Sequence, residues 1–337
     1  MKKVLGLFVV LLLMTVVALG CSGQETQGEP NEQANGGSDN QEGEATSDYP
    51  TKPIEVIVPA GAGGDTDRNT RALARYLEDE LGQSIVVSNV TGAGGTVATR
   101  QVLDSDPDGY TVLAFHDSIL LNYILGLADF SFQDFEVAGV SVQDQGNTFL
   151  INGDSEFETL DELIEFAKDN PKELSIATEF GAHTHLQLLA FEEATGVDFN
   201  IVDVGGASDK ITALLGGQVD VNPTQLGLVK DYLASGDMRS LGVFAEERLN
   251  AMPDVPTFKE QGVDVIFNKS FLWAFPPGTP EEVVNAFSEA MEKTVTENEE
   301  YRAELENHVV TPNFMGPEEA IQHLAETQEF YSELHAE

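Results

Sequence analysis

The sequence predicts an α/β fold with mostly parallel sheets. Short runs rich in β-branched residues alternate with segments whose apolar residues recur at helical spacing, which is the pattern of strands joined by helices. Two of these strands, Ile54–Val58 and Ile85–Val87, are each followed by a glycine-rich turn. Such a turn, when it leads from a strand into a helix, aims backbone N–H groups at an anion. The two turns therefore predict one ligand site built from both.

Runs of β-branched and aromatic residues between turn residues predict ten strands. Their expected bounds are Ile54–Val58, Ser84–Ser88, Thr111–Phe115, Glu136–Val140, Thr148–Ile151, Leu174–Ala177, Asn200–Val204, Val219–Asn222, Ser240–Phe244 and Ser270–Phe275.

Three helices have clear start signals. Thr159, followed three residues later by Glu162, forms the pattern of a capping box. Thr279 before Pro280 predicts an N-cap with proline at the first helical position, and Ser208 predicts the N-cap of a third helix.

The start of the chain has the features of a secretory signal. Lys2 and Lys3 precede an apolar run from Val4 to Leu19, which is short for a membrane span. Leu19-Gly20-Cys21 resembles a bacterial lipobox, and Cys21 is the only cysteine. We expect a signal peptide over residues 1–20 and lipid on Cys21, which anchors the protein to the outer face of the cell membrane. Residues 22–48 lack large apolar side chains, so residues 21–48 are predicted to form a disordered acidic tether.

The net charge of −41 excludes some classes of partner. It opposes binding to nucleic acid and attraction to anionic lipid. Because lysine and arginine are scarce, we expect a bound anion to be held by backbone dipoles without a cation. The acidity suits life at high salt or high pH, and it also suits simple solubility.

Other chemistries find little support. His183 and His185 would share a face on a strand, but a helical pattern begins there, so no metal site is expected. The turn at Gly61–Gly64 lacks the lysine of a P-loop and the last glycine of a dinucleotide fingerprint, and no cofactor is predicted. His116-Asp117-Ser118 contains triad residue types, but neighbours in sequence do not have triad geometry. We expect His116 to line the mouth of a pocket.

A collinear series of motifs runs from about residue 49 to residue 330. It includes Tyr49–Ile54, Ile57–Pro59, Ala62–Gly64 with Asp67 and Arg71, Leu81–Gln83, Gly92–Gly95, Pro107–Thr111, Ala167–Pro171, Leu214–Asp220, Pro253–Thr257 and Pro277–Pro280. With this series the chain resembles the solute receptors of tripartite tricarboxylate transporters, also called Bug proteins.

The resemblance implies a two-lobed periplasmic-binding-protein-like (type II) fold, each lobe a mostly parallel sheet flanked by helices. Lobe 1 would comprise residues 49–149 plus 266–337, and lobe 2 residues 150–265. The lobes would close over a small carboxylate and deliver it to the membrane subunits of a transporter driven by an ion gradient. The resemblance implies no enzymatic activity, and we expect a monomer.

By position, the resemblance also implies the ligand-binding residues. Ala62, Gly63, Gly64 and Thr66 would surround one carboxylate, Gly92, Ala93 and Gly94 would form the second loop, and Thr178 and Gly181 would contribute from lobe 2. Asp67 and Arg71 match as well, and we expect them to form a structural pair across one helical turn.

The chain departs from the family pattern near the ligand. Ala60 replaces the usual aromatic residue and should leave more room, Asp203–Gly206 replaces a motif with a tyrosine and a cation, and Glu179 lies close to the expected ligand. These changes fit a ligand whose distal group is not a second carboxylate, including one with a positive charge. Trp273, on an apolar strand, is equally compatible with the core and with a ligand contact.

Two alternatives to a transport receptor remain open. A receptor that presents a carboxylate to a sensor kinase would have the same binding domain. A secreted hydrolase would need a positioned nucleophile and base, which the sequence does not show.

Overall fold

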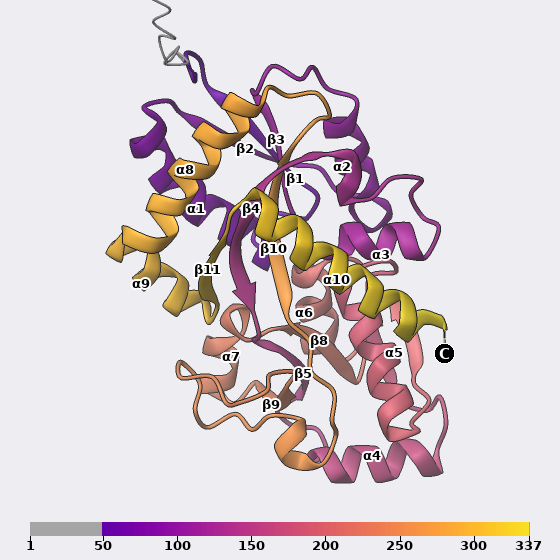
Figure 1. Ribbon diagram of the computed structural model, residues 1–337. Helices are drawn as coiled ribbons and strands as arrows, with labels where there is room; N and C mark the ends of the chain where they lie inside the picture. Colours follow the sequence, from indigo (N-terminus) through magenta and orange to yellow (C-terminus); the bar gives the residue numbers. More distant parts are fainter. Residues whose placement is uncertain (1–48, 337) are drawn as a thin grey trace, which may run out of the picture. The chain divides into compact units, whose positions relative to one another are not determined.

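The computed structural model describes residues 49–336, which contain two β-sheets with helices packed on both (Figure 1). The predicted signal peptide, Cys21 and the tether lie outside the described residues. As far as Asn152 the elements are β1 (Ile54–Val58), α1 (Asp65–Leu81), β2 (Ile85–Asn89), η1 (Ala93–Gly95), α2 (Thr96–Leu103), β3 (Thr111–His116), α3 (Ser118–Ile124), η2 (Phe132–Asp134), β4 (Glu136–Asp144) and β5 (Asn147–Asn152).

The remaining elements follow in two groups. From Leu160 to Val243 they are α4 (Leu160–Asp169), β6 (Ser175–Thr178), α5 (His183–Thr195), β7 (Asn200–Asp203), α6 (Ala207–Leu215), β8 (Val221–Gln225), η3 (Leu226–Leu228), α7 (Lys230–Ser235) and β9 (Met238–Val243). The last are η4 (Lys259–Gln261), β10 (Lys269–Phe275), α8 (Glu281–Glu297), α9 (Glu299–His308), β11 (Thr311–Met315) and α10 (Pro317–Ala336).

Each sheet combines a parallel group of strands with antiparallel neighbours. The first sheet has the order β11-β4-β10-β3-β1-β2, in which β1 is parallel to β2 and β3, while β10 is antiparallel to β3 and β4. The second sheet has the order β7-β6-β8-β5-β9, in which β6 is parallel to β7 and β8, while β5 is antiparallel to β8 and β9. The predicted two-lobed α/β fold is confirmed.

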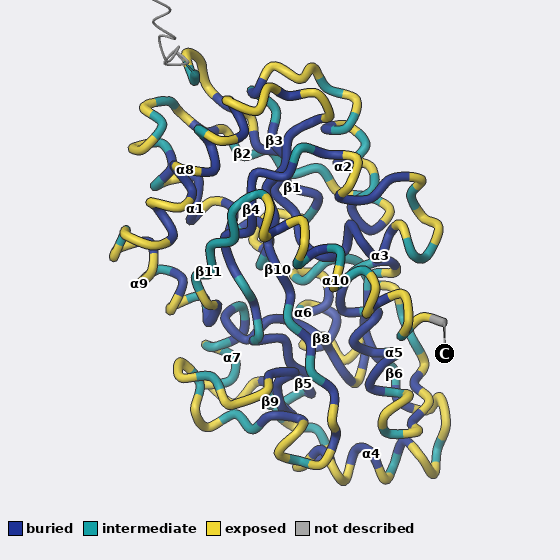
Figure 2. Tube along the Cα trace, in the orientation of Figure 1, coloured by how far each residue is buried: buried dark blue, intermediate teal, exposed yellow. Residues whose placement is uncertain are grey.

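Helices cover both faces of the first sheet because successive strand residues point to opposite sides. Val56 and Val58 pack in one apolar cluster with Leu73 of α1 and Phe287 of α8. Ile57, between the two valines, belongs to the cluster formed with α2, α3 and α10. Strands β1, β3 and β10 are therefore buried along most of their length (Figure 2).

The second sheet is arranged in the same way. Phe149 of β5 packs with Phe191 of α5, and Leu150, the next residue, packs with Leu214 of α6. The apolar cluster that contains Phe149 also contains Leu113 of the first sheet, so one core continues from one sheet to the other.

The chain passes between the sheets twice, at the short connection from β4 to β5 and along residues 244–268, which join β9 to β10. Helix α10 joins the sheets a third time. The hydroxyl of Tyr331 donates to Asp117 Oδ2 at 3.2 Å and lies 3.4 Å from His183 Nδ1. Asp117 follows a strand of the first sheet and His183 follows a strand of the second.

All ten predicted strands are present, with bounds that differ by a few residues, but β11 was missed. The capping box at Thr159 is confirmed. The predicted cap at Ser208 is wrong, because the N-cap of α6 is Gly206, two residues earlier, and Ser208 lies within the helix. The predicted cap at Thr279 is also wrong. The Thr279 hydroxyl donates to the Pro276 carbonyl at 2.8 Å, and Pro280 takes the N-cap position.

None of the helices between Tyr49 and Ala336 is both long and apolar enough to cross a membrane.

Candidate functional site

A small cavity lies where the carboxyl ends of the parallel strands of both sheets meet. Its lining comes mainly from the segments that follow β1, β2 and β3 in the first sheet and β6 and β7 in the second. The end of β8 and the starts of β5 and β10 complete it. Its volume is ≈ 90 Å³. Pockets for drug-sized molecules have volumes of roughly 300–1,000 Å³. Since ligands of open α/β sheets bind at this edge, the cavity is suited to a small metabolite.

The amino ends of three helices face this cavity. Its lining includes the first turns of α1, α5 and α6, with Thr66, Thr184 and Ser208 among them. Each helix N-terminus carries a partial positive charge of about half a unit, which favours an anion. Asp65 and Asp209, in the first turns of α1 and α6, offset part of this charge.

A buried ion cluster forms one wall. The ammonium group of Lys269, at the start of β10, contacts the carboxylates of Asp65 and Asp144, the latter at 3.2 Å. Burial opposes ionisation of Asp65, but the attraction to Lys269 outweighs it and holds the pKa of Asp65 below its usual range. The positive charge of Lys269 is thus shared between two carboxylates.

Lys210, on α6, is a second buried cation in the cavity. Its side chain is only 4% exposed and donates to the Thr184 hydroxyl at 3.0 Å. Among the described residues it forms no ion pair. Burial lowers the pKa of Lys210 to about 8, although Asp65 and Glu179 act in the opposite direction. A desolvated ammonium group of this kind is stabilised by any anion that enters the cavity.

Two histidines in the lining are neutral. Burial, reinforced by Lys269, lowers the pKa of His116 to about 3, and burial also lowers the pKa of His183 well below its usual value. His183 donates its backbone N–H to Ser118 Oγ at 2.9 Å, which joins the segments after β6 and β3. These imidazoles offer hydrogen bonds to a ligand, but no charge.

The structure brings together some of the predicted site residues and separates others. Ala60, Gly64, Thr66, Gly94 and His116 line the cavity. The residues that do not line it are Ala62, Gly63, Gly92, Ala93, Thr178, Gly181, Asp203 and Trp273.

Two of the residues outside the lining have other contacts. The Trp273 indole is buried, donates to Ser141 Oγ at 3.0 Å and packs on Phe287. Asp203 accepts from the backbone N–H groups of Phe180 and Gly205, at 3.3 and 3.1 Å, and so shapes the loops after β6 and β7.

The glycine loop after β1 is held by its own helix. The backbone N–H of Gly63 donates to Asp67 Oδ2 at 2.8 Å, and Arg71 Nε donates to Asp67 Oδ1 at 2.8 Å. The expected structural pair of Asp67 and Arg71 is confirmed. The N–H of Gly63 is already engaged, so it is not a free donor for a ligand.

The cavity contains two cations that the sequence did not predict, because Lys210 and Lys269 both line it. The sequence contains a signal for Lys210. It precedes Ala213 and Leu214 by three and four residues, so helical spacing places it on their buried face. No comparable signal marks Lys269. Its partners, Asp65 and Asp144, are both far from it in the sequence.

In the part of the chain that the structure describes, no group of three or more His, Cys, Asp or Glu side chains is arranged to hold a metal ion.

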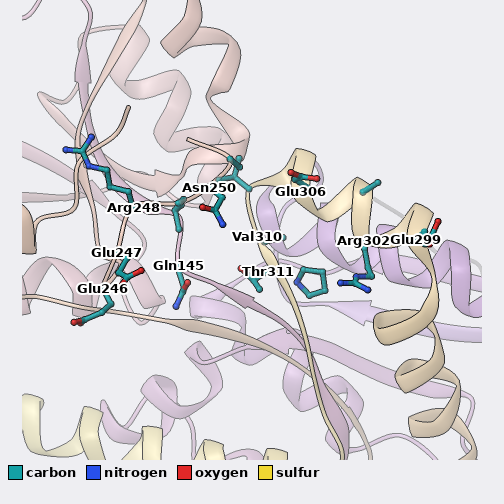
Figure 3. Close-up of a pocket in the computed structure, with 15 residues that line it drawn as sticks. Gln145, Glu246, Glu247, Arg248, Asn250, Glu299, Arg302, Glu306, Val310 and Thr311 are labelled. Carbon is teal, nitrogen blue, oxygen red and sulfur yellow. The ribbon is translucent and has the colours of Figure 1, made fainter. Parts of the chain in front are cut away.

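Figure 3 shows a second, larger hollow, of ≈ 760 Å³, between the loop at Glu246–Ala251 and the region of α9 and β11. Its charged residues are all exposed; they are Glu246, Glu247, Arg248, Glu299, Arg302 and Glu306. Arg248 is engaged by Glu260 at 2.8 Å. The smaller cavity, with its buried charges, is therefore the better candidate for a specific ligand.

A family model described as "Tripartite tricarboxylate transporter family receptor" matches residues 70–334. The chain belongs to this family of transporter receptors. It is similar to the protein BugT of Bordetella pertussis, with 33% identity over 241 residues, which are 70% of this chain and 74% of BugT. It is also similar to a UPF0065 protein in the gbd 5′ region of Cupriavidus necator, with 31% identity over 296 residues, 83% of this chain and 85% of that protein.

The chain also has the same fold as the solved structure of the periplasmic binding protein BugD. The TM-score is 0.77 at 28% sequence identity, and the alignment covers 85% of this chain and 97% of BugD. The family resemblance seen in the sequence is thereby confirmed.

Proposed function

We propose that this chain is an extracytoplasmic receptor that captures one small carboxylate between two lobes and delivers it to the membrane subunits of a tripartite transporter. Lobe 1 is built on the first sheet and lobe 2 on the second. The expected boundary between residues 149 and 150 falls inside β5, a strand of the second sheet, so lobe 2 begins at the connection before Asn147 and ends before β10. The protein acts as a monomer, is anchored through lipid on Cys21 and carries out no chemical reaction on its ligand.

Lys210 is the observation that carries this proposal. A buried ammonium group costs several kcal/mol unless it is paired, and Lys210 has only a neutral hydroxyl as its partner. It lies among three helix N-termini, which favour the same sign of ligand charge. A carboxylate would satisfy both, and the family to which the chain belongs is named for tricarboxylate transport.

Closure of the lobes accounts for the small size of the cavity. Across the two sheets, Arg68 Nη1 donates to the Gly227 carbonyl at 3.0 Å, in addition to the bond between His183 and Ser118. We propose that these bonds break when the lobes rotate about the two connections, as in other hinge-closing proteins. A ligand then enters, and closure excludes water from it.

The test uses the mature chain. Native mass spectrometry of the purified protein should detect a bound carboxylate, and calorimetry with that compound should show loss of binding in Lys210→Met. Lys168→Met removes an exposed lysine of the same lobe and serves as the matched control. Normal binding by Lys210→Met, or a copurifying ligand without a carboxylate, would contradict the proposal.

The partner is tested separately, by measuring uptake of the labelled ligand in cells with and without this gene. Loss of uptake supports delivery to a transporter. Unchanged uptake, together with ligand-dependent activation of a sensor kinase, would assign the receptor to signalling.

A further inference from the structure

The charged side chains that line the cavity limit the ligands it accepts. Five carry a formal charge: Asp65, Glu179, Asp209, Lys210 and Lys269. Three of these are negative and two are positive. The ion pairs of Lys269 with Asp65 and Asp144 leave Lys210 as the one lining cation, among the described residues, without a carboxylate partner. The site thus has one cationic anchor for a carboxylate.

Glu179 is the complementary feature. It follows β6, is partly buried, and its side chain forms no hydrogen bond or ion pair with another described residue. Burial raises the pKa of Glu179, and Asp203, Asp65 and Asp209 raise it further, while Lys210 lowers it. Glu179 follows β6, and Lys210 lies in the first turn of α6, which follows the neighbouring strand β7, but the two side chains are not ion-paired. One unpaired carboxylate and one ammonium group without a carboxylate partner therefore face the same small space.

Two neutral groups add an independent indication that polar ligand atoms bind here. His183 Nε2 and Thr224 Oγ1 are both buried without a hydrogen-bond partner among the described residues, and both residues line the cavity. Their side chains are 2% exposed in each case. Because buried polar atoms are normally hydrogen-bonded, these two are suited to a polar ligand.

We infer that the ligand is a zwitterion that carries one carboxylate and one ammonium group. The carboxylate pairs with Lys210 near the helix N-termini, and the ammonium group lies beside Glu179. A dicarboxylate of similar length would place its second negative charge next to Glu179 and Asp209, where like charges repel. This inference rests on the proposed function, because it specifies the ligand class of the same site.

The experiment compares two series of probes with the same carbon backbones. Calorimetry measures binding of ω-amino acids from glycine to 6-aminohexanoate, of common α-amino acids, and of the dicarboxylates that correspond to the ω-amino acids. We expect at least one amino acid to bind about tenfold or more tightly than the dicarboxylate of equal length. Equal or tighter binding of the dicarboxylates would overturn the inference but leave the proposed function intact. If no carboxylate binds, both fail.

A charge-removing variant tests the role of Glu179 itself. Glu179→Gln keeps the shape of the side chain, so we expect the apo protein to retain its Tm. Binding of the best amino acid should weaken about tenfold, while binding of the matched dicarboxylate should be unchanged or stronger. Glu173→Gln, which removes an exposed acid of the same lobe, should leave the ratio of the two affinities unchanged. An unchanged ratio in Glu179→Gln would also overturn the inference.

Discussion

The ammonium group of Lys269 lies 3.2 Å from the carboxylate of Asp144, and the two residues stand on adjacent strands at the points where the chain passes between the sheets. Lys269 opens β10 and Asp144 ends β4. Their contact therefore joins the two connections and, through Asp65, reaches the start of α1.

Replacement of Lys269 by methionine should be strongly destabilising. It leaves Asp65 and Asp144 without a cation in a buried setting, which typically costs about 3–5 kcal/mol. Lys259→Met removes a cation from an exposed pair with Glu246, which solvent screens, so it should leave stability almost unchanged. Urea denaturation measures both free energies of unfolding. Similar values for the two variants would contradict the importance of the buried cluster.

Asp117 should make stability depend on pH. Burial raises the pKa of Asp117 to about 7, above its ordinary value. A raised pKa favours the protonated form in the folded state, so this contribution to stability is fully present below about pH 4 and is lost as the pH rises through 7.

Asp117→Asn removes this titration. Its free energy of unfolding relative to wild type should rise by on the order of 2 kcal/mol between pH 5 and pH 8. Thermal unfolding at both pH values measures the change, and Asp106→Asn, at an exposed position, is the control. If the difference from wild type stays constant with pH, Asp117 is not the group responsible.

Gly94 is the glycine at which an added methyl group should impair lobe closure. Its φ is +63°, and a Cβ there would lie 3.0 Å from the Phe180 carbonyl oxygen, on the loop after β6. Gly63 has a similar φ of +80°, but a Cβ there would meet nothing closer than Ser208 Oγ at 3.9 Å. Both alanine variants should lose about 1–2 kcal/mol of stability from backbone strain.

Only Gly94→Ala should also weaken ligand binding, by about tenfold or more. The added methyl group would push Gly94 away from the Phe180 carbonyl of the other lobe, so this contact must open by a few tenths of an ångström. Calorimetry with the identified ligand compares the two variants. An equal loss of affinity in Gly63→Ala would show that strain alone is responsible.

Lipid anchoring is tested at Cys21, the only cysteine of the chain. Cys21→Ser should leave an uncleaved precursor or release the protein from membranes, because the thiol is the proposed attachment point. Stable retention by lipid requires more than one acyl chain. Cell fractionation with immunoblotting distinguishes these outcomes. A processed serine variant that still sediments with membranes would contradict the lipoprotein assignment.

Most of the fold could be predicted because strands such as β1, β3 and β10 are apolar runs with turn residues beside them. β11 escaped detection for a physical reason. It contains Pro312 and Asn313, which have low strand propensity, but it lies at the edge of the first sheet, where a proline is tolerated. Its place is set by its pairing with β4, which local sequence does not reveal.

The site was predicted less completely. The loops after β1 and β2 and the position of His116 follow from local patterns, and Ala60, Gly64, Thr66 and Gly94 do line the cavity. Which atoms of a loop face the ligand depends on turns that the sequence does not specify, as the engaged N–H of Gly63 shows. The buried cations depend on long-range packing, and Lys269 acquires its role from a carboxylate more than a hundred residues away.

The order in which strands enter the two sheets determines the order in which the protein can fold. The second sheet uses one continuous stretch, from β5 to β9, and can form as soon as that stretch is free. The first sheet needs β10 and β11, so its pairing with β4 must wait for segments near the end of the chain. Contacts between distant segments form slowly. The larger sheet, whose first strand leads into the first glycine loop, is therefore completed last, and the nascent chain must keep β1 to β4 from aggregating until then.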